Sequence, residues 1–114
     1  MDDIFSRLER SKFRSGIHLN EKEKIFVVNK GMQKIGEDAY DILDKKIRIK
    51  RDSDGKQTPW HGHPVFVAQH GTATCCRKCI EKWYKIPQNK VLDERETKFF
   101  LEIILRWIEK EAKN

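Results

Sequence analysis

A wide apolar stripe near the end of the 114-residue sequence constrains the fold more than any other feature. Asp93 and Glu96 have the spacing of a helix-capping pair. The apolar residues after them recur at intervals of three and four: Phe99, Phe100, Ile103, Ile104, Trp107 and Ile108. A stripe of this width has to be covered by other elements. We therefore predict a helix that starts after Asp93, runs to about residue 110 and packs centrally.

Shorter helical patterns occupy much of the preceding sequence. Asn20 and Glu23 form a second capping pair, and Gly31 supplies a stop for the helix that they begin. Thr72 or Thr74 can cap a helix beside the cysteines. Together with apolar residues at helical spacing, these signals predict four more helices: residues 2–10, 21–30, about 37–47 and about 75–84.

The centre of the chain is expected to be irregular. Residues 56–71 (KQTPWHGHPVFVAQHG) contain two prolines, and the apolar run at residues 65–67 favours one short strand. The RDSDG string before it is typical of a turn. A chain of this length can bury one core without disulfides. We expect a mainly α, single-domain fold over residues 1–114, with about five helices and an irregular central segment that has room for a short strand or hairpin.

The positive charge of the chain is concentrated in its middle. The formal net charge is +6, and residues 45–90 contain eleven lysines and arginines against three acidic residues. Such an excess favours a polyanionic partner, for which nucleic acid is our hypothesis; a solvated lysine-rich surface is the alternative. The candidate phosphate contacts are Arg77, Lys78, Lys82 and Lys85.

Other features of the sequence indicate the compartment. No apolar run approaches the length of a membrane span, so we expect no membrane partner. The first residues, MDDIFSRLER, lack the basic start and apolar core of a signal peptide. An odd number of cysteines, crowded into CCRKC, suits a reducing environment. We therefore expect a cytoplasmic protein.

Residues 61–79, HGHPVFVAQHGTATCCRKC, contain all three cysteines and three of the four histidines. In extended backbone, His61 and His63 leave the same face. On a helix that starts near Thr74, the three cysteines lie within an arc of about 100°. Thiolate and imidazole are preferred zinc ligands, so we hypothesise a structural zinc site with Cys76, Cys79 and one of these two histidines. The full set of candidate ligands is His61, His63, His70, Cys75, Cys76 and Cys79.

The same residues permit other interpretations. The cysteines share their arc with Ile80 and Trp83, so they can instead be small apolar residues of the core. A thiol-based enzyme or redox switch built on the three cysteines is a second alternative. A zinc deaminase is disfavoured, because HGH at residues 61–63 lacks the glutamate of the H-x-E motif. A metal-free protein–protein interaction module, including a small homo-oligomer, is the third.

Four strings, spread along nearly the whole chain, carry a resemblance: IFSRLERSKFRSGIHL, GKQTP, GHPVFVAQHGTATCCRKCIEKWYKIP and RWIEK. In these strings the sequence resembles a family of short microbial and viral proteins described as domain of unknown function 4186. The resemblance implies a single-domain protein of uncharacterised activity. It places the functional centre at His63, Gln69, His70, Thr72, Thr74, Cys75, Cys76, Arg77 and Cys79. Gly71 stands where the resemblance leads us to expect alanine, a departure that should not disturb this centre.

Overall fold

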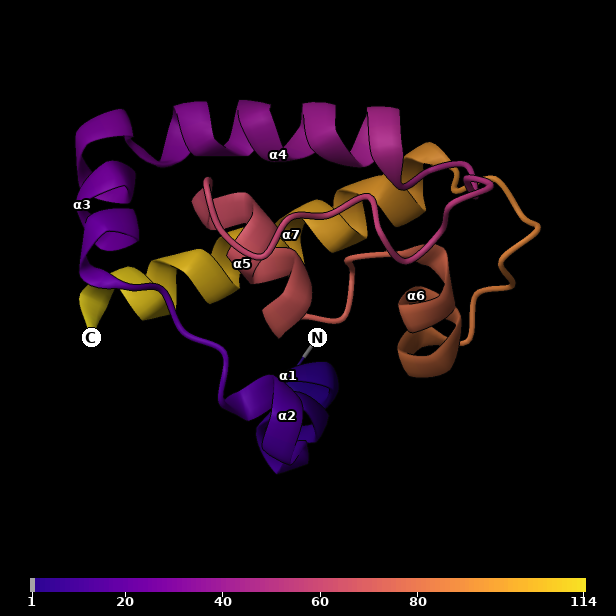
Figure 1. The fold of residues 1–114 in the computed structure, drawn as a ribbon, viewed down its shortest axis with the longest axis horizontal. Helices are drawn as coiled ribbons and strands as arrows, with labels where there is room; N and C mark the ends of the chain where they lie inside the picture. The colour runs from indigo at the N-terminus through magenta and orange to yellow at the C-terminus, as the bar shows by residue number, and fades with distance from the viewer. Residues whose placement is uncertain (1) are drawn as a thin grey trace.

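A computed structural model describes residues 2–114, and within that range it contains seven helices and no strand (Figure 1). The mainly α prediction is therefore confirmed. The helices are α1 (Asp2–Arg10), α2 (Lys12–Ser15), α3 (Glu21–Lys30), α4 (Met32–Lys46), α5 (Pro64–Gly71), α6 (Arg77–Tyr84) and α7 (Glu94–Lys113).

Helix α7 lies at the centre, as its apolar stripe predicts. It packs along α4 and is also contacted by α5 and α3, with α3 standing across one end of the pair (Figure 1). Phe100, Ile104 and Ile108 of α7 are fully buried against Ile35 and Leu43 of α4 in the main core. The central helix thus holds α3, α4 and α5 around one apolar cluster.

Both predicted capping boxes are confirmed. Asn20 and Glu23 exchange hydrogen bonds between side chain and backbone, each of 2.8 Å, and α3 begins at the next residue after Asn20. Asp93 and Glu96 do the same at the start of α7, at 3.0 and 2.8 Å. These bonds satisfy N–H groups that the first turn of a helix leaves without partners.

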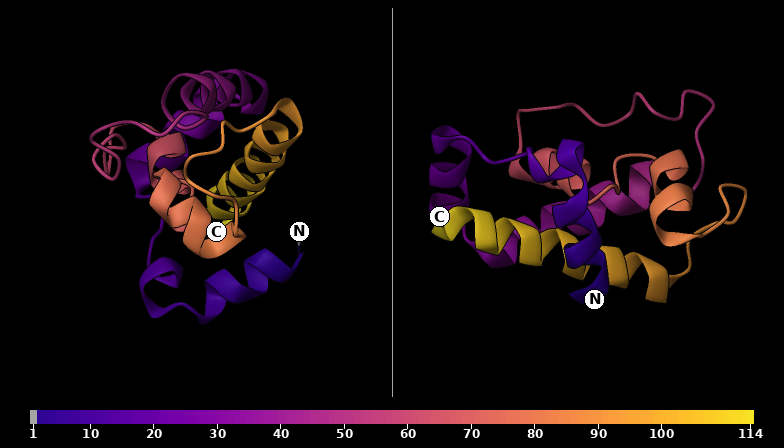
Figure 2. Two further views of the ribbon diagram at one scale, coloured as in Figure 1. Left: turned by 90° about the vertical axis from the view of Figure 1, so that its right-hand side faces the viewer. Right: turned by 90° about the horizontal axis from the view of Figure 1, so that it is seen from below.

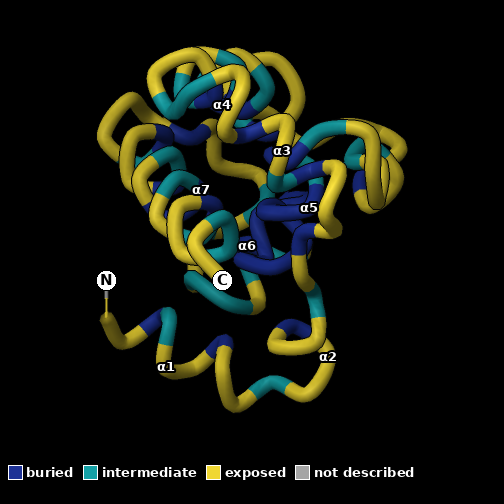
Figure 3. Tube along the Cα trace, turned by 90° about the vertical axis from the view of Figure 1, so that its left-hand side faces the viewer, coloured by how far each residue is buried: buried dark blue, intermediate teal, exposed yellow. Residues whose placement is uncertain are grey.

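The strand predicted at residues 65–67 is wrong, because these residues lie in α5. Pro64 occupies the first helical turn, and the Nδ1 atom of the N-cap residue His63 accepts a hydrogen bond from the Val65 N–H at 3.0 Å. Nearly every residue of α5 is buried (Figure 3). A helix that is covered on all sides has no amphipathic pattern, and its short apolar run resembles that of a buried strand.

Two other helix predictions need correction, and one helix was not predicted. Helix α4 starts at Met32 and not near residue 37, so Gly36 lies inside it. Helix α6 starts at Arg77 with Cys76 as its N-cap, so neither predicted threonine caps it. Helix α2 has four residues and was not predicted. The predicted turn in RDSDG is confirmed at residues 52–55.

Helices α1 and α2 form a separate layer beside α5 and α7 (Figure 1; Figure 2, left). Ile4 and Leu8 of α1 are buried against Ala73 and Ile103 in a second, smaller apolar cluster. Arg7 adds a hydrogen bond of 2.8 Å to a backbone carbonyl of α6. In the part of the chain that the structure describes, no helix has the length and apolar character needed to cross a bilayer.

Candidate metal centre

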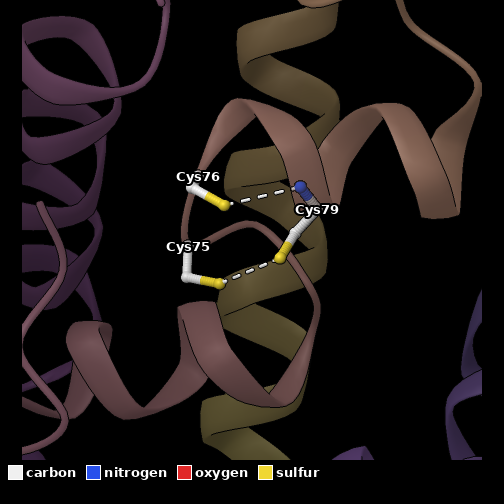
Figure 4. A group of neighbouring side chains, drawn as sticks. All are labelled: Cys75, Cys76 and Cys79. Carbon is white, nitrogen blue, oxygen red and sulfur yellow. Dashed lines mark hydrogen bonds between the residues drawn. The ribbon is translucent and has the colours of Figure 1, made fainter. Parts of the chain in front are cut away.

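The three cysteines converge at the start of α6 (Figure 4). The sulfurs of Cys75, Cys76 and Cys79 all lie within 4.8 Å of one another. Cys75 Sγ and Cys79 Sγ are 3.6 Å apart, and all three thiols are free. Cys75 and Cys76 are buried, and Cys79 is partly exposed. The CCRKC string therefore forms one compact sulfur cluster.

A tight turn between α5 and α6 brings the cysteines together. Ala73 has a left-handed backbone conformation with φ of 60°, which is costly for a residue with a side chain. A backbone bond of 2.8 Å from the Thr74 N–H to the Gln69 carbonyl fixes the turn. The Tyr84 hydroxyl donates to the Thr72 carbonyl at 2.6 Å, and this links the turn to the end of α6. The sulfurs are thus held by a well-bonded backbone.

The first turn of α6 is capped by two side chains. Cys76 Sγ accepts a hydrogen bond from the Cys79 N–H at 3.4 Å. The Asp54 carboxylate accepts from the N–H groups of Arg77 and Lys78 at 3.0 and 3.1 Å. Asp54 comes from the loop after α4, so this loop is attached directly to the helix that carries the cysteines. A carboxylate also interacts favourably with the positive end of the helix dipole.

Arg14 supplies the positive charge of the cluster. Its side chain is only 9% exposed, and its Nη2 atom donates to Cys79 Sγ at 3.3 Å. Its Nη1 atom lies 3.9 Å from Cys75 Sγ and donates to the His70 carbonyl at 2.7 Å. A guanidinium in this position favours the thiolate form of the sulfurs that it touches.

The three thiols differ in acidity. Hydrogen bonds from Cys75 and Cys76, together with the Arg14 guanidinium, lower the pKa of Cys79 to about 2. Hydrogen bonds to Cys76 and Cys79 and burial raise the pKa of Cys75. The pKa of Cys76 is also raised, because its bond with Cys75 acts to lower the pKa but the effects of Cys79 and of burial outweigh it. Among the three thiols, Cys79 is therefore the one whose charged form its surroundings favour.

His70 lies beside the cluster without joining the group of sulfurs. Its Nε2 atom is 3.2 Å from the Thr58 carbonyl, and burial lowers the pKa of its imidazole. Trp60 stacks on the imidazole with ring centroids 3.7 Å apart and an angle of 10° between the planes. The Thr58 hydroxyl donates to the Cys75 carbonyl at 2.7 Å. The loop between α4 and α5 therefore packs against the cysteine turn through Thr58 and against α5 through Trp60.

The other two candidate histidines are paired with carboxylates on other helices. His61 Nδ1 lies 3.0 Å from Glu23 of α3. His63 Nε2 lies 3.0 Å from Asp38 of α4, and because its Nδ1 accepts from a backbone N–H, the proton of the neutral ring is on Nε2. The structure therefore brings the three cysteines together but does not bring His61 or His63 to them.

The basic candidates have different environments. Arg77 is fully buried and donates to the carbonyls of Arg48 and Pro87 at 2.8 and 2.9 Å. The prediction that it contacts phosphate is therefore corrected: its guanidinium links two loops inside the protein. Lys78, Lys82 and Lys85 are exposed.

Two residues of the centre were missed by the sequence analysis. Arg14 is 61 residues away from Cys75 in the sequence, and Asp54 lies in a turn whose carboxylates resembled ordinary turn residues. Neither has a local pattern that identifies its partner. The resemblance covered the string that contains Arg14, but a string alone does not show which side chains meet.

Comparisons with known proteins agree with the resemblance. No solved structure gave a significant match to this chain. A family model, described as domain of unknown function (DUF4186), matches residues 2–109, a range that includes Arg14, the loop with Asp54 and all three cysteines. The chain therefore belongs to the DUF4186 family.

Proposed function

We propose that this domain binds a zinc ion through Cys75, Cys76 and Cys79. The observation that carries the proposal is the convergence of three free sulfurs within 4.8 Å. Zinc–sulfur bonds of about 2.3 Å in a tetrahedron give a sulfur–sulfur distance of about 3.8 Å. The separation of 3.6 Å between Cys75 and Cys79 is close to that value. Thiolates are soft ligands, which zinc accepts readily.

The charges around the sulfurs support this proposal. Three thiolates and a Zn²⁺ ion together carry one negative charge, and the buried Arg14 guanidinium at 3.3 Å compensates it. The raised pKa values of Cys75 and Cys76 mean that zinc has to displace their protons. The proposed ligand set contains neither His61 nor His63, the histidines of our first hypothesis.

Such an ion would stabilise the connection between α5 and α6. It would join the end of the turn, at Cys75 and Cys76, to the first turn of α6 at Cys79. A ligand that binds only the folded state adds about 4 kcal/mol to the free energy of unfolding when its free concentration is a thousand times its dissociation constant. The proposed role of the metal is therefore structural.

The first test is the zinc content of protein that is purified without a histidine tag or a chelator. We expect about one zinc per chain in the original protein and a large loss in Cys75→Ser, Cys76→Ser and Cys79→Ser. His61→Ala is the matched control, because its exposed ring pairs with Glu23 and should be dispensable for the metal. Zinc that is retained by all three serine variants would contradict the proposal.

A second readout does not depend on the serine variants, so it still tests the proposal when those variants fold poorly. Cobalt(II) can replace zinc in tetrahedral sites, and thiolate ligands give it charge-transfer absorption. We expect this absorption in metal-exchanged original protein and in His61→Ala. Its absence from both, in protein that is shown to be folded by circular dichroism, would overturn the three-sulfur site.

Thiol chemistry is the second candidate function, favoured by the contact of 3.3 Å between Arg14 and Cys79 Sγ. It requires a reactive thiolate and no bound metal. Fast alkylation of Cys79 in folded protein as purified, with no zinc or iron present, would support it. Protection of all three cysteines by stoichiometric zinc would exclude it as the resting function.

A further inference from the structure

A group of exposed cations lies where the first part of the loop at residues 47–63 meets α6, beside the turn that carries the cysteines. The group, which we name the basic surface, consists of Lys50, Arg51, Lys56, Lys78 and Lys82, all of them exposed. The first part of the loop and α6 lie at the end of the molecule opposite α3 and the C-terminus, whereas the second part of the loop runs back across α5 toward α3 (Figure 1), where His61 pairs with Glu23. The basic surface therefore combines cations from two segments that are distant in sequence.

Buried contacts fix these two segments to each other. Asp54 of the loop caps α6 through the N–H groups of Arg77 and Lys78. The Arg77 guanidinium donates to the Arg48 carbonyl at the start of the loop, at 2.8 Å. Because these bonds are in place before any ligand arrives, the backbone that carries the cations needs little ordering when a ligand binds, and only the side chains become ordered.

The cations of the basic surface also differ in their pairing from several others on the molecule. Lys30, Lys45 and Lys90 form ion pairs with Asp38, Asp41 and Glu96. Among residues 2–114, no carboxylate oxygen lies within 4.0 Å of a charged nitrogen of the basic surface. The nearby Asp54 and Glu81 carboxylates accept hydrogen bonds, from α6 and from Gln88. Unpaired cations grouped in this way produce a strong local positive potential.

Trp60 adds a flat aromatic group on the same loop. It is 52% exposed although one of its faces is stacked on the His70 ring. Phe13 meets it edge to face, with ring centroids 6.1 Å apart. The indole is thus held in a fixed orientation while much of its surface stays open to solvent.

We propose that the basic surface and the loop as far as Trp60 together bind single-stranded nucleic acid. Lysines that follow the backbone phosphates, combined with an exposed aromatic side chain that stacks on a base, are the features by which proteins hold single strands. The basic surface supplies the first and Trp60 the second. An anionic membrane surface has no flat base to stack on a fixed indole, so the pairing of features favours nucleic acid.

The test is fluorescence anisotropy with a labelled single strand of about 20 thymidines and protein that carries its metal as purified. Binding should weaken steeply as salt rises from about 50 to 200 mM. Lys78→Ala with Lys82→Ala should weaken it at least about tenfold at low salt and reduce the slope of log affinity against log salt by about 1.4.

Lys110→Ala with Lys113→Ala is the matched control. It removes the same charge from the last turns of α7, at the C-terminal end of the molecule and away from α6, and should leave affinity and slope nearly unchanged. Trp60→Ala should weaken binding by about 5- to 100-fold with an unaltered salt slope, and Trp60→Phe should restore part of the loss. Melting curves verify that each variant is folded.

Three results would overturn the proposal: no binding at low salt, equal losses in the two double-lysine variants, or full affinity in folded Trp60→Ala. Vesicles that contain phosphatidylserine serve as a competitor. If they bind the protein while the oligonucleotide does not, the basic surface is a membrane contact and the assignment to nucleic acid is wrong.

Discussion

Two buried charged side chains, Asp54 and Arg77, attach the loop after α4 to α6. Arg77 replaces its water contacts with two backbone carbonyls, and Asp54 replaces its own with two backbone N–H groups and the Gln57 amide. Hydrogen bonds to charged groups are about twice as strong as neutral ones. A few side chains thus position the cysteine turn from a segment more than 20 residues away in the sequence.

Asp54→Asn should lower the free energy of unfolding by about 1–3 kcal/mol at pH 7, because an amide oxygen replaces only part of the carboxylate's bonding. Burial acts to raise the pKa of Asp54, but bonds from Gln57, Arg77 and Lys78 lower it below the ordinary 3.8. Its stabilisation is therefore complete above that pH and is lost as the pH falls through the folded-state value. Urea unfolding at pH 7, 5 and 3 should show the difference from the original protein shrinking only at pH 3.

Asp52→Asn is the control for this measurement. Asp52 is the exposed acidic neighbour in the same turn, and its replacement should change stability by no more than about 0.5 kcal/mol. A difference between the original protein and Asp54→Asn that is the same at all three pH values would contradict the role of the ionised carboxylate.

At the scale of elements, close approach of α5 and α7 depends on Gly71. A Cβ atom at this position would lie 2.7 Å from two carbons of the Trp107 ring, closer than real atoms approach. Our sequence expectation of alanine here conflicts with that geometry. A chain with alanine at this position therefore needs a smaller or shifted side chain opposite it.

Gly71→Ala should cost about 1–3 kcal/mol of stability through overpacking. Combined with Trp107→Leu, it should cost less than the sum of the two single changes, because the smaller side chain leaves space for the methyl group. Denaturant unfolding of the four proteins in the cycle measures this coupling. Additive effects would show that the indole has room to move away.

The sequence predicted those elements whose ends are specified locally. The capping boxes at the starts of α3 and α7 depend on residues three apart, and both were identified. Helix α5 was mistaken for a strand, because burial on all sides removes the periodicity that separates the two. Helical spacing predicted that the cysteines are close, but the turn before α6 brings them together, because Cys75 and Cys76 lie outside the helix. The positions of the histidines depend on how the loop crosses α3 and α4. Tertiary packing, which no local pattern records, placed His61 and His63 elsewhere.

The whole molecule consists of a bundle and a smaller layer attached to it. The main core joins α3, α4, α5 and α7, whereas α1 is held through Ile4 and Leu8 in a second cluster. Arg14 of α2 belongs to the smaller layer and yet contacts the sulfurs. Opening of α1 and α2 would therefore remove the charge that stabilises the Cys79 thiolate. The stability of the layer and the chemistry of the cysteines are coupled through this one side chain.

Leu8→Ala should reveal this division, because it removes a buried side chain from the second cluster alone, at a cost of about 2–5 kcal/mol. Hydrogen exchange of α1 and α2 should accelerate at least about tenfold, while α4 and α7 change much less. In metal-free protein the cysteines should also be alkylated faster. Leu43→Ala in the main core is the control and should accelerate exchange in both parts. If Leu8→Ala accelerates exchange in α4 and α7 as much as in α1, the layer and the bundle unfold as one cooperative unit.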